Sequence, residues 1–144
     1  MAFRGQYEHS LDSKNRLAIP ARFRSSFSSG LVLAKDVDAC VAVWTPDRHE
    51  AIIERALEGL NPMGARYRKL SRFFQGNSYD LELDSAGRVT LGPKLLEHAG
   101  VEKEVTVVGV GDHLEIWDRE RWSEGEAARD AEIEEVTELL GNPS

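Results

Sequence analysis

Cysteine is nearly missing from this chain of 144 residues, because Cys40 is the only one. A single cysteine excludes a disulfide within the chain and suits a reducing compartment. Long apolar runs are missing too: none approaches the roughly 20 residues of a membrane-spanning helix. The first residues, Met1 to Gln6, show no apolar stretch of the signal-peptide kind. We therefore expect a cytoplasmic protein without a membrane partner.

Patterns typical of catalysis or metal binding are also scarce. The four histidines are scattered without paired ligand spacing, and no second cysteine supports zinc. Asp36 and Asp38 are spaced like the opening of a calcium loop, but the glycine and glutamate that should follow are missing. Cys40 precedes an apolar run, which favours an inert buried thiol. We expect no enzyme, no cofactor, no bound metal and no small-molecule substrate.

Charge is distributed unevenly along the chain. The net charge of −7 argues at first against a nucleic-acid partner. Residues 1–35, however, carry a net charge of +4, and residues 115–140 carry −7. The six basic residues of the first segment are Arg4, Lys14, Arg16, Arg22, Arg24 and Lys35, against Glu8 and Asp12. One end of the chain can thus meet phosphate while the other is repelled by it.

An internal repeat is the most informative feature of the sequence. Residues 11–19 (Leu-Asp-Ser-Lys-Asn-Arg-Leu-Ala-Ile) match residues 83–91 (Leu-Asp-Ser-Ala-Gly-Arg-Val-Thr-Leu) at an offset of 72. Residues 41–44, ending in Trp44, match residues 114–117, ending in Trp117, at an offset of 73. Two separated blocks that match in the same order indicate two copies of one structural unit.

Each copy predicts a strand, a tight hairpin turn, a second strand, a short helix and two further strands. Asn15 and Gly87 stand where the turn needs a residue that tolerates positive φ. Pro20 and Pro93 suit the first turn of the short helices. We expect strands at 5–11, 16–19, 31–34 and 41–44 in the first copy and at 79–83, 88–91, 105–110 and 113–117 in the second, with short helices at 21–27 and 94–98.

Three longer helices are expected outside the repeated blocks, at 45–60, 63–74 and 119–140. In the second helix Met63, Tyr67, Leu70 and Phe74 fall on one face. In the last helix the expected packing residues are Trp122, Ile133, Val136 and Leu140. We expect three parts: a first unit with its following helix (1–60), a connecting basic amphipathic helix (61–76), and a second unit with an acidic C-terminal helix (77–144).

These motifs resemble a known architecture and a known family. A four-stranded unit with Asp-x-x-x-Arg in its first hairpin resembles the AbrB-type swapped-hairpin barrel. The paired motif closely resembles the MraZ family, on residues Phe3-Arg4-Gly5, Leu11 to Leu17, Pro20, Phe23 and Arg24. One departure is Asn15, where the family usually has glycine. The resemblance implies an α+β fold with two interlocked units in one pseudo-symmetric barrel and flanking helices.

The same resemblance implies a function. It points to a bacterial transcriptional regulator of the division and cell-wall gene cluster, its own gene included. Such proteins bind direct repeats in promoter DNA and assemble as homo-oligomeric rings, which also implies association with the nucleoid. We expect repression. The alternative is an oligomeric scaffold whose basic face binds an acidic protein and does not distinguish one duplex sequence from another.

The first hairpin supplies the candidate DNA contacts. A two-stranded hairpin fits the major groove, where Arg16 can bond two acceptors of a guanine edge. Asn15 can pair with an adenine edge or a phosphate, and Lys14 lies beside it. Phosphate contacts are expected from Lys14, Arg22 and Arg24, joined by Arg4.

The remaining motif residues have structural readings. Asp12 and Asp84 are expected to accept hydrogen bonds from turn amides and to pair with arginine. Arg88 stands between structure and DNA contact, because its turn lacks a second basic residue. The basic run at Arg66, Arg68, Lys69 and Arg72 can be a second phosphate site or simply a solvated helix face.

Overall fold

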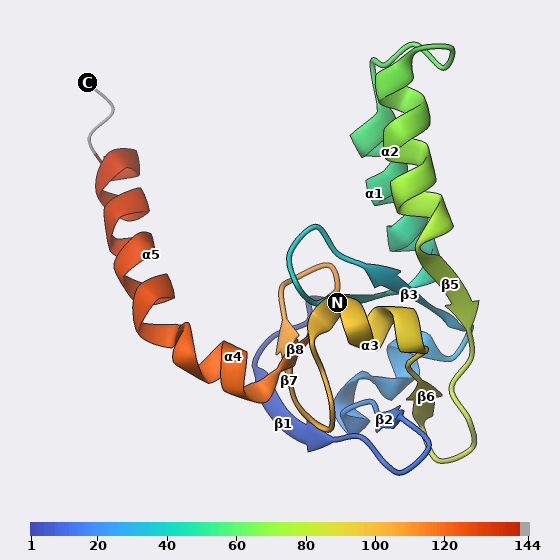
Figure 1. The fold of residues 1–144 in the computed structure, drawn as a ribbon, viewed down its shortest axis with the longest axis vertical. Coiled ribbons are helices and arrows are strands. Elements are labelled where there is room, and N and C mark those ends of the chain that lie inside the picture. Colours follow the sequence, from blue (N-terminus) through green and yellow to red (C-terminus); the bar gives the residue numbers. More distant parts are fainter. Residues whose placement is uncertain (142–144) are drawn as a thin grey trace.

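The computed structural model describes residues 1–141 and has a mixed fold of helices and antiparallel sheet (Figure 1). The first repeat contains β1 (Gln6–Ser10), β2 (Arg16–Ala18), the 3-10 helix η1 (Ala21–Phe27), β3 (Leu31–Lys35) and β4 (Val41–Trp44). The second contains β5 (Ser78–Leu81), β6 (Arg88–Thr90), α3 (Pro93–Ala99), β7 (Glu104–Gly109) and β8 (Leu114–Asp118). Helices α1 (Pro46–Leu57) and α2 (Ala65–Gly76) join the repeats, and α4 (Arg119–Glu124) and α5 (Glu126–Gly141) follow them.

Strands of the two repeats interlock in one six-stranded sheet with the order β1-β7-β8-β4-β3-β5. β1 of the first repeat pairs with β7 of the second, and β5 of the second pairs with β3 of the first. β2 and β6 form a separate two-stranded ladder. Because β1 and β5 are the two edges, the six-stranded sheet does not close into a barrel.

The core lies between the six-stranded sheet, the β2–β6 ladder and the short helices. Leu17 of β2, Val89 of β6 and Leu33 of β3 belong to the same buried cluster. Every residue of β4 is buried, because its outward face packs under α1 in a smaller cluster of Val32, Ala34, Ala42 and Trp44, with Ile52 of α1 against it. Burial of each large apolar side chain contributes roughly 1.5–3 kcal/mol before entropy is counted. The core therefore joins both repeats into one folding unit.

Several helix boundaries differ from the sequence expectation. Thr45 caps α1, as its hydroxyl oxygen accepts a hydrogen bond from the Arg48 amide at 3.4 Å, but the helix ends at Leu57. α2 begins at Ala65, so Met63 lies in the preceding loop and is 81% exposed. The first short helix is a 3-10 helix rather than an α-helix. Its Pro20 precedes the helix, whereas Pro93 is the first residue of α3.

The expected helix over 119–140 is broken at Gly125, which ends α4. The packing prediction for Ile133, Val136 and Leu140 was wrong within this chain, since their exposed fractions are 62%, 49% and 78%. Trp122 does pack, with its ring centroid 5.4 Å from that of Trp117. Apolar residues at helical spacing in the sequence therefore do not establish that the same chain covers them. No helix within residues 1–141 is long and apolar enough to cross a membrane.

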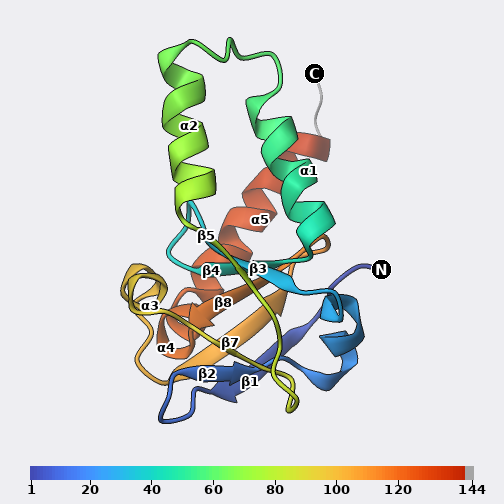
Figure 2. The same cartoon turned by 90° about the vertical axis from the view of Figure 1, so that its right-hand side faces the viewer.

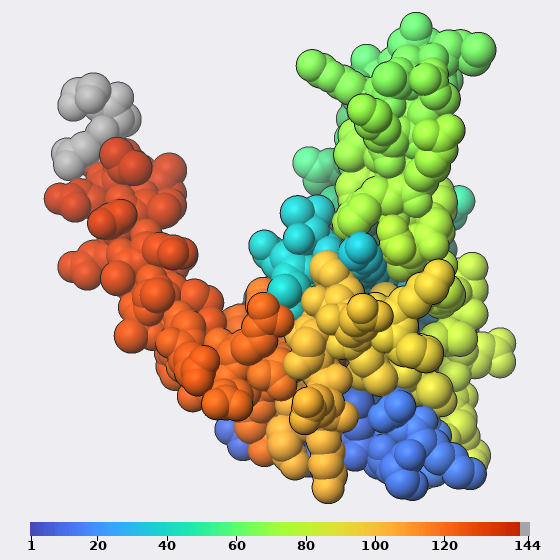
Figure 3. Space-filling model, in the orientation of Figure 1, coloured from blue at the N-terminus to red at the C-terminus, as the bar shows by residue number. Residues whose placement is uncertain are grey.

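The two motif turns lie at one end of the molecule. In Figures 1 and 2 the β1–β2 and β5–β6 connections both lie at the lower end, and the α1–α2 pair and α5 extend upward. Figure 3 shows α5 standing away from the main body. The acidic last helix therefore projects away from the two turns.

Candidate nucleic-acid interface

The first motif turn is organised around the carboxylate of Asp12. Its Oδ1 accepts hydrogen bonds from the amides of Lys14 and Arg16, each at 2.9 Å, and its Oδ2 accepts one from the Arg16 Nε at 2.6 Å. The Asp12 carbonyl accepts from the Asn15 amide at 3.0 Å. One side chain thus fixes both the turn and the arginine that ends it.

The second turn repeats this arrangement around Asp84. The Asp84 Oδ1 accepts from the amides of Ala86 at 2.9 Å and Arg88 at 2.8 Å, and its Oδ2 accepts from the Arg88 Nε at 2.9 Å. Both aspartates thus accept hydrogen bonds from turn amides and pair with the arginine of their own turn. Hydrogen bonds from the backbone amides of Arg16 and Arg88 are the main reason that the pKa values of the two carboxyl groups lie below their usual range.

Positive φ occurs in each turn where the sequence indicated it. Asn15 has φ of +58° and is the only non-glycine residue with positive φ among residues 1–141. Gly87 has φ of +76° at the matching position. Asparagine is one of the few residues that adopts this conformation readily. Asn15 therefore preserves the turn while placing an exposed amide at its tip.

The strands that flank each turn do not pair with each other, which corrects the expected β1–β2 hairpin. β2 pairs instead with β6, with Leu17 opposite Val89. The ladder is extended at both ends by reciprocal bonds between the repeats: the Leu91 amide donates to the Asn15 carbonyl at 2.9 Å, and the Ile19 amide donates to the Gly87 carbonyl at 3.0 Å. The two-stranded element at this end consequently contains one strand from each repeat.

Arg16 and Arg88 occupy matching positions but differ in their contacts. Both use Nε to bind the aspartate of their own turn. The Arg88 Nη1 also lies 3.7 Å from Oδ2 of Asp12, in the other turn. Within residues 1–141 the terminal amino groups of Arg16 make no hydrogen bond or ion pair. Arg16 is thus oriented by Asp12 with two donor groups directed elsewhere, whereas Arg88 bridges the two turns.

Charge at the two tips is unequal. Lys14 and Asn15 are exposed at the first tip, and Ala86 and Gly87 take their places at the second. The lysine and the asparagine add a cation and an amide that the second turn lacks. The first tip is therefore richer in groups that can donate to phosphate or to base edges.

The other predicted phosphate contacts have contacts of their own. Arg22 is exposed, and its Nη1 donates to the Tyr7 hydroxyl at 2.9 Å, which in turn donates to the Arg4 carbonyl at 2.9 Å. Arg22 thus contacts this tyrosine through its side chain, whereas Arg4 does so through its backbone carbonyl. Arg24 is partly buried, and its Nε donates to the Ile19 carbonyl at 2.8 Å. The sequence did not indicate that Arg24 has this structural contact.

The basic run of α2 belongs to another part of the molecule. Arg66, Arg68, Lys69 and Arg72 are exposed on the helix that extends away from the turns (Figure 1). Arg68 donates to the Met63 carbonyl of the loop that precedes α2. The fold does not bring this run to the motif turns.

Sequence reasoning missed one group of side chains altogether. Asp36 and Cys40 flank the β3–β4 connection, and the pairing of β4 with β8 brings Glu115 beside them. Asp36 and Glu115 are 79 positions apart, so no local spacing could reveal the group.

Comparison with known proteins identifies the family. Residues 2–68 and 74–140 each match the family model described as "MraZ protein, putative antitoxin-like". The chain belongs to the MraZ family. It is 39% identical over 138 residues to the "Transcriptional regulator MraZ" of Caldanaerobacter subterraneus subsp. tengcongensis, which covers 96% of each chain. The proteins of the same name from Heliobacterium modesticaldum and Limosilactobacillus fermentum are 38% and 35% identical, covering 96% and 93% of each chain.

The similarity to the MraZ relatives extends over both repeats and the elements between them. The two matched segments coincide with the two strand sets described above, and the first also includes α1. The sequence resemblance to this family is therefore confirmed.

Proposed function

We propose that this MraZ-family chain is a sequence-specific DNA-binding transcriptional regulator. The name that its relatives share, transcriptional regulator MraZ, supports regulation of transcription. As finer parts of the proposal, it represses the bacterial division and cell-wall gene cluster, its own gene included, and binds promoter direct repeats as a homo-oligomeric ring. It acts in the cytoplasm in association with the nucleoid.

The paired turns carry this proposal. Asp12 accepts three hydrogen bonds, from the Lys14 amide, the Arg16 amide and the Arg16 Nε, and the terminal amino groups of Arg16 remain for a ligand. A guanine edge in the major groove offers two acceptors, O6 and N7, to such a group. The exposed amide of Asn15 suits an adjacent adenine edge or a phosphate. Pre-orientation reduces the side-chain entropy that binding costs.

Phosphate contacts would set the register of the turns on the duplex. Lys14 is exposed at the tip, and the Arg22 guanidinium binds the Tyr7 hydroxyl, which donates to the backbone carbonyl of Arg4. We assign these three residues to phosphates, because phosphate contacts position a protein without reading its sequence. Arg24 can join them only through its terminal amino groups, since its Nε is bonded to Ile19. We assign Arg88 mainly to holding the turns together.

We also propose that the two repeats form one pseudo-symmetric barrel, in which the β2–β6 ladder covers the side between edge strands β1 and β5. Leu17 and Val89 of that ladder share a buried cluster with Leu33 and Val107 of the main sheet, which supports this arrangement. In our proposal residues 1–60 read DNA and residues 61–76 connect the two units. Residues 77–144 complete the barrel and contribute to the homo-oligomer.

Oligomerisation accounts for apolar side chains that the chain leaves exposed. Leu139 and Leu140 of α5 are 75% and 78% exposed, and Leu70 of α2 is 36% exposed. Apolar residues gathered on projecting helices are typical of interaction surfaces. A closed ring would cover them and present several first turns to one duplex.

The test is a titration of the purified protein against duplex DNA from upstream of its own gene and against a scrambled duplex of equal length. The proposal expects preference for the promoter duplex by about 10³-fold or more at physiological salt. Equal affinity for both duplexes would favour a scaffold whose basic face binds acidic partners. The salt concentration must be fixed, because nonspecific binding depends steeply on it.

A further inference from the structure

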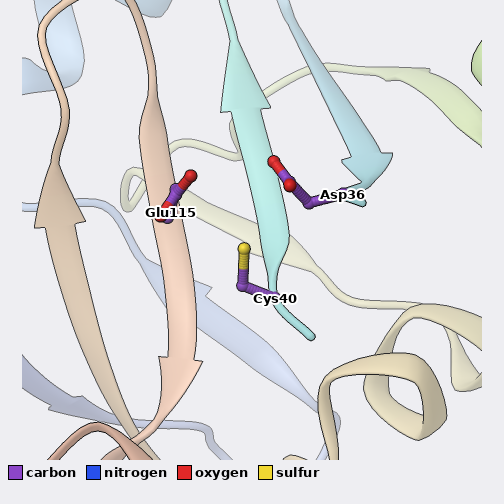
Figure 4. A group of neighbouring side chains, drawn as sticks. All are labelled: Asp36, Cys40 and Glu115. Carbon is purple, nitrogen blue, oxygen red and sulfur yellow. The ribbon is translucent and has the colours of Figure 1, made fainter. Parts of the chain in front are cut away.

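A mixed group of metal-binding side chains lies far from the motif turns, at the junction of the two repeats. Sγ of Cys40, a carboxylate oxygen of Asp36 and a carboxylate oxygen of Glu115 all lie within 4.8 Å of one another. In Figure 4 the sulfur of Cys40 is directed toward the space between the two carboxylates. Asp36 and Cys40 belong to the first repeat and Glu115 to the second.

The thiol of Cys40 is buried without a partner. Its residue has no exposed surface, and within residues 1–141 the sulfur makes no hydrogen bond. Burial and the nearby carboxylates of Glu115 and Asp36 raise the pKa of this thiol far above its usual range. An apolar contact alone would explain a buried cysteine, but not its position between two carboxylates.

Both carboxylates are already oriented by other donors. Glu115 Oε1 accepts from the Trp117 Nε1 at 3.0 Å, and its Oε2 lies 3.3 Å from Nε2 of His113. Asp36 Oδ1 accepts from the Asp38 amide at 3.0 Å. A carboxylate has about four lone-pair sites, so each retains capacity for a further ligand. Ligating carboxylates in metal sites are typically hydrogen-bonded in this way.

We propose that Asp36, Cys40 and Glu115 bind one zinc-like divalent ion that joins the two repeats. Two ligands about 2.0–2.3 Å from a tetrahedral ion lie roughly 3.3–3.8 Å apart, so the group needs to contract by only about 1 Å. Binding forms a bond between the ion and sulfur, and the thiol proton leaves to solvent.

The donor set selects the class of ion. Thiolate sulfur favours zinc and similar transition ions, whereas Ca²⁺ takes six to eight oxygen ligands and Mg²⁺ a near-octahedral set of oxygens. Asp38, which the sequence grouped with Asp36 as the opening of a calcium loop, is not part of the group. Its amide orients Asp36 instead. Zinc and cobalt are therefore the probes, and calcium and magnesium are the comparison ions.

Direct binding to the untagged, reduced full-length chain tests the site. Zinc affinity is measured by competition with a chromophoric chelator, and melting temperature is measured with and without zinc. The proposal expects one ion per chain, a rise in Tm of several degrees that EDTA reverses, and no rise with Ca²⁺ or Mg²⁺. Co²⁺ should give thiolate-to-metal charge-transfer absorption, which identifies Cys40 as a ligand.

Single substitutions distinguish the proposed zinc ligands from neighbouring side chains that do not bind the ion. Cys40→Ser should abolish the cobalt charge-transfer band. Asp36→Asn should weaken zinc binding by about 100-fold or more, because loss of a ligand should cost at least as much as loss of a group that supports one. Asp38→Asn is the matched control and should bind as the parent does. Asp36 is only partly buried, so Asp36→Asn decides the matter if Cys40→Ser fails to fold. The proposal is overturned if the parent shows no cobalt–thiolate band, or if Asp36→Asn binds zinc as tightly as Asp38→Asn.

Discussion

Arg24 of the first repeat packs directly against Gly87 of the second. A methyl group on Gly87 would lie 2.5 Å from the Arg24 Nε and 2.6 Å from its Cδ, closer than real side chains approach. The same Nε donates to the Ile19 carbonyl, and the Ile19 amide donates to the Gly87 carbonyl. Arg24 therefore links the second motif turn, which contains Gly87, to Ile19 at the end of β2.

Gly87→Ala should lower the free energy of unfolding by more than the matched change Gly59→Ala. Gly59 has a φ of +78°, close to the +76° of Gly87, but open space around it. The left-handed backbone alone costs an alanine roughly 1–2 kcal/mol. At Gly87 the displaced Arg24 should lose its hydrogen bond as well, adding about 0.5–1.5 kcal/mol. Chemical denaturation of both variants measures the difference.

A double variant isolates the contact itself. Combining Gly87→Ala with Arg24→Ala should give a smaller loss than the two single changes added together, because the clash is then counted only once. Strict additivity would show that Arg24 does not constrain the second turn.

The local chemistry of the turns was readable from the sequence, but their partners were not. Asp12, Asn15 and Arg16 define the turn through contacts within five residues, so residue types alone indicate it. The pairing of β2 with β6, in contrast, is set by burial of Leu17 and Val89 in a shared core. Alternating apolar residues indicate a strand without naming its neighbour.

Other long-range contacts could not be predicted from the sequence. The charge of Arg24 is visible in the sequence, but its packing against Gly87, 63 positions away, is not. Cys40 is buried, as its apolar neighbours indicated, but its position beside Glu115 of the other repeat could not be predicted. In α5, Ile133 and Val136 are apolar and were expected to pack, but within residues 1–141 their side chains are exposed.

Arg16→Ala should weaken promoter binding by about 1–3 kcal/mol, the range for a good bidentate base contact. Arg88→Ala should affect DNA affinity less and melting temperature more, since Arg88 contacts the aspartates of both turns. Both ion pairs of Arg88 are about one-third exposed, so the loss of stability should be small. Parallel titration and calorimetry of the two variants make the comparison. Equal losses of DNA affinity in both variants, with no loss of stability in either, would contradict the proposed difference in role between the two turns.

Lys14→Gln should reduce the slope of log affinity against log salt concentration by about 1, as expected for one lost phosphate contact. Its effect should be similar on promoter and scrambled duplexes, because a phosphate contact carries no sequence information. Lys69→Gln on α2 is the matched control, removing the same charge from the helix that extends away from the turns. A larger slope change for Lys69→Gln would instead place the phosphate site on the α2 basic run.

Acid should destabilise the fold through His49. Burial lowers the pKa of His49 below its ordinary value of 6.5, although the charges of Asp80 and Glu50 oppose this, and Nε2 lies 3.0 Å from the Ser78 hydroxyl. The folded state thus favours the neutral ring. Its contribution is fully present above pH 6.5 and is lost as pH falls from there toward the lowered pKa.

His49→Gln, which keeps a polar group without a titrating one, should flatten the dependence of Tm on pH between pH 7.5 and 5. Burial also lowers the pKa of His9, and hydrogen bonds to Glu115 and Asp112 raise that of His113, so both histidines can add to the pH dependence of each protein. The difference between parent and variant therefore isolates His49. Parallel Tm curves for the two proteins would show that His49 does not contribute.

DNA recognition should depend on assembly, because one pair of turns is too small a reader. Each good base contact contributes about 1–3 kcal/mol, which leaves little discrimination among roughly 10⁶ or more competing genomic sites. In an oligomer, binding of one first turn to DNA raises the local concentration of the first turns of the other subunits. This helps only if the spacing of the DNA repeats matches the spacing of the turns. A duplex with one repeat should therefore bind far more weakly than one with several correctly spaced repeats.

Shifting the spacing between repeats by half a helical turn tests this mechanism without altering any base of a repeat. Affinity should fall, because the second turn then faces the wrong side of the duplex. Titration of the shifted and unshifted duplexes is paired with measurement of the protein's mass, in the parent and in Leu139→Glu, which places a charge on the exposed face of α5. If that face mediates assembly, the variant should lose both mass and preference for multiple repeats. A monomeric protein that binds single and multiple repeats equally per site would refute the dependence on assembly while leaving DNA binding itself in place.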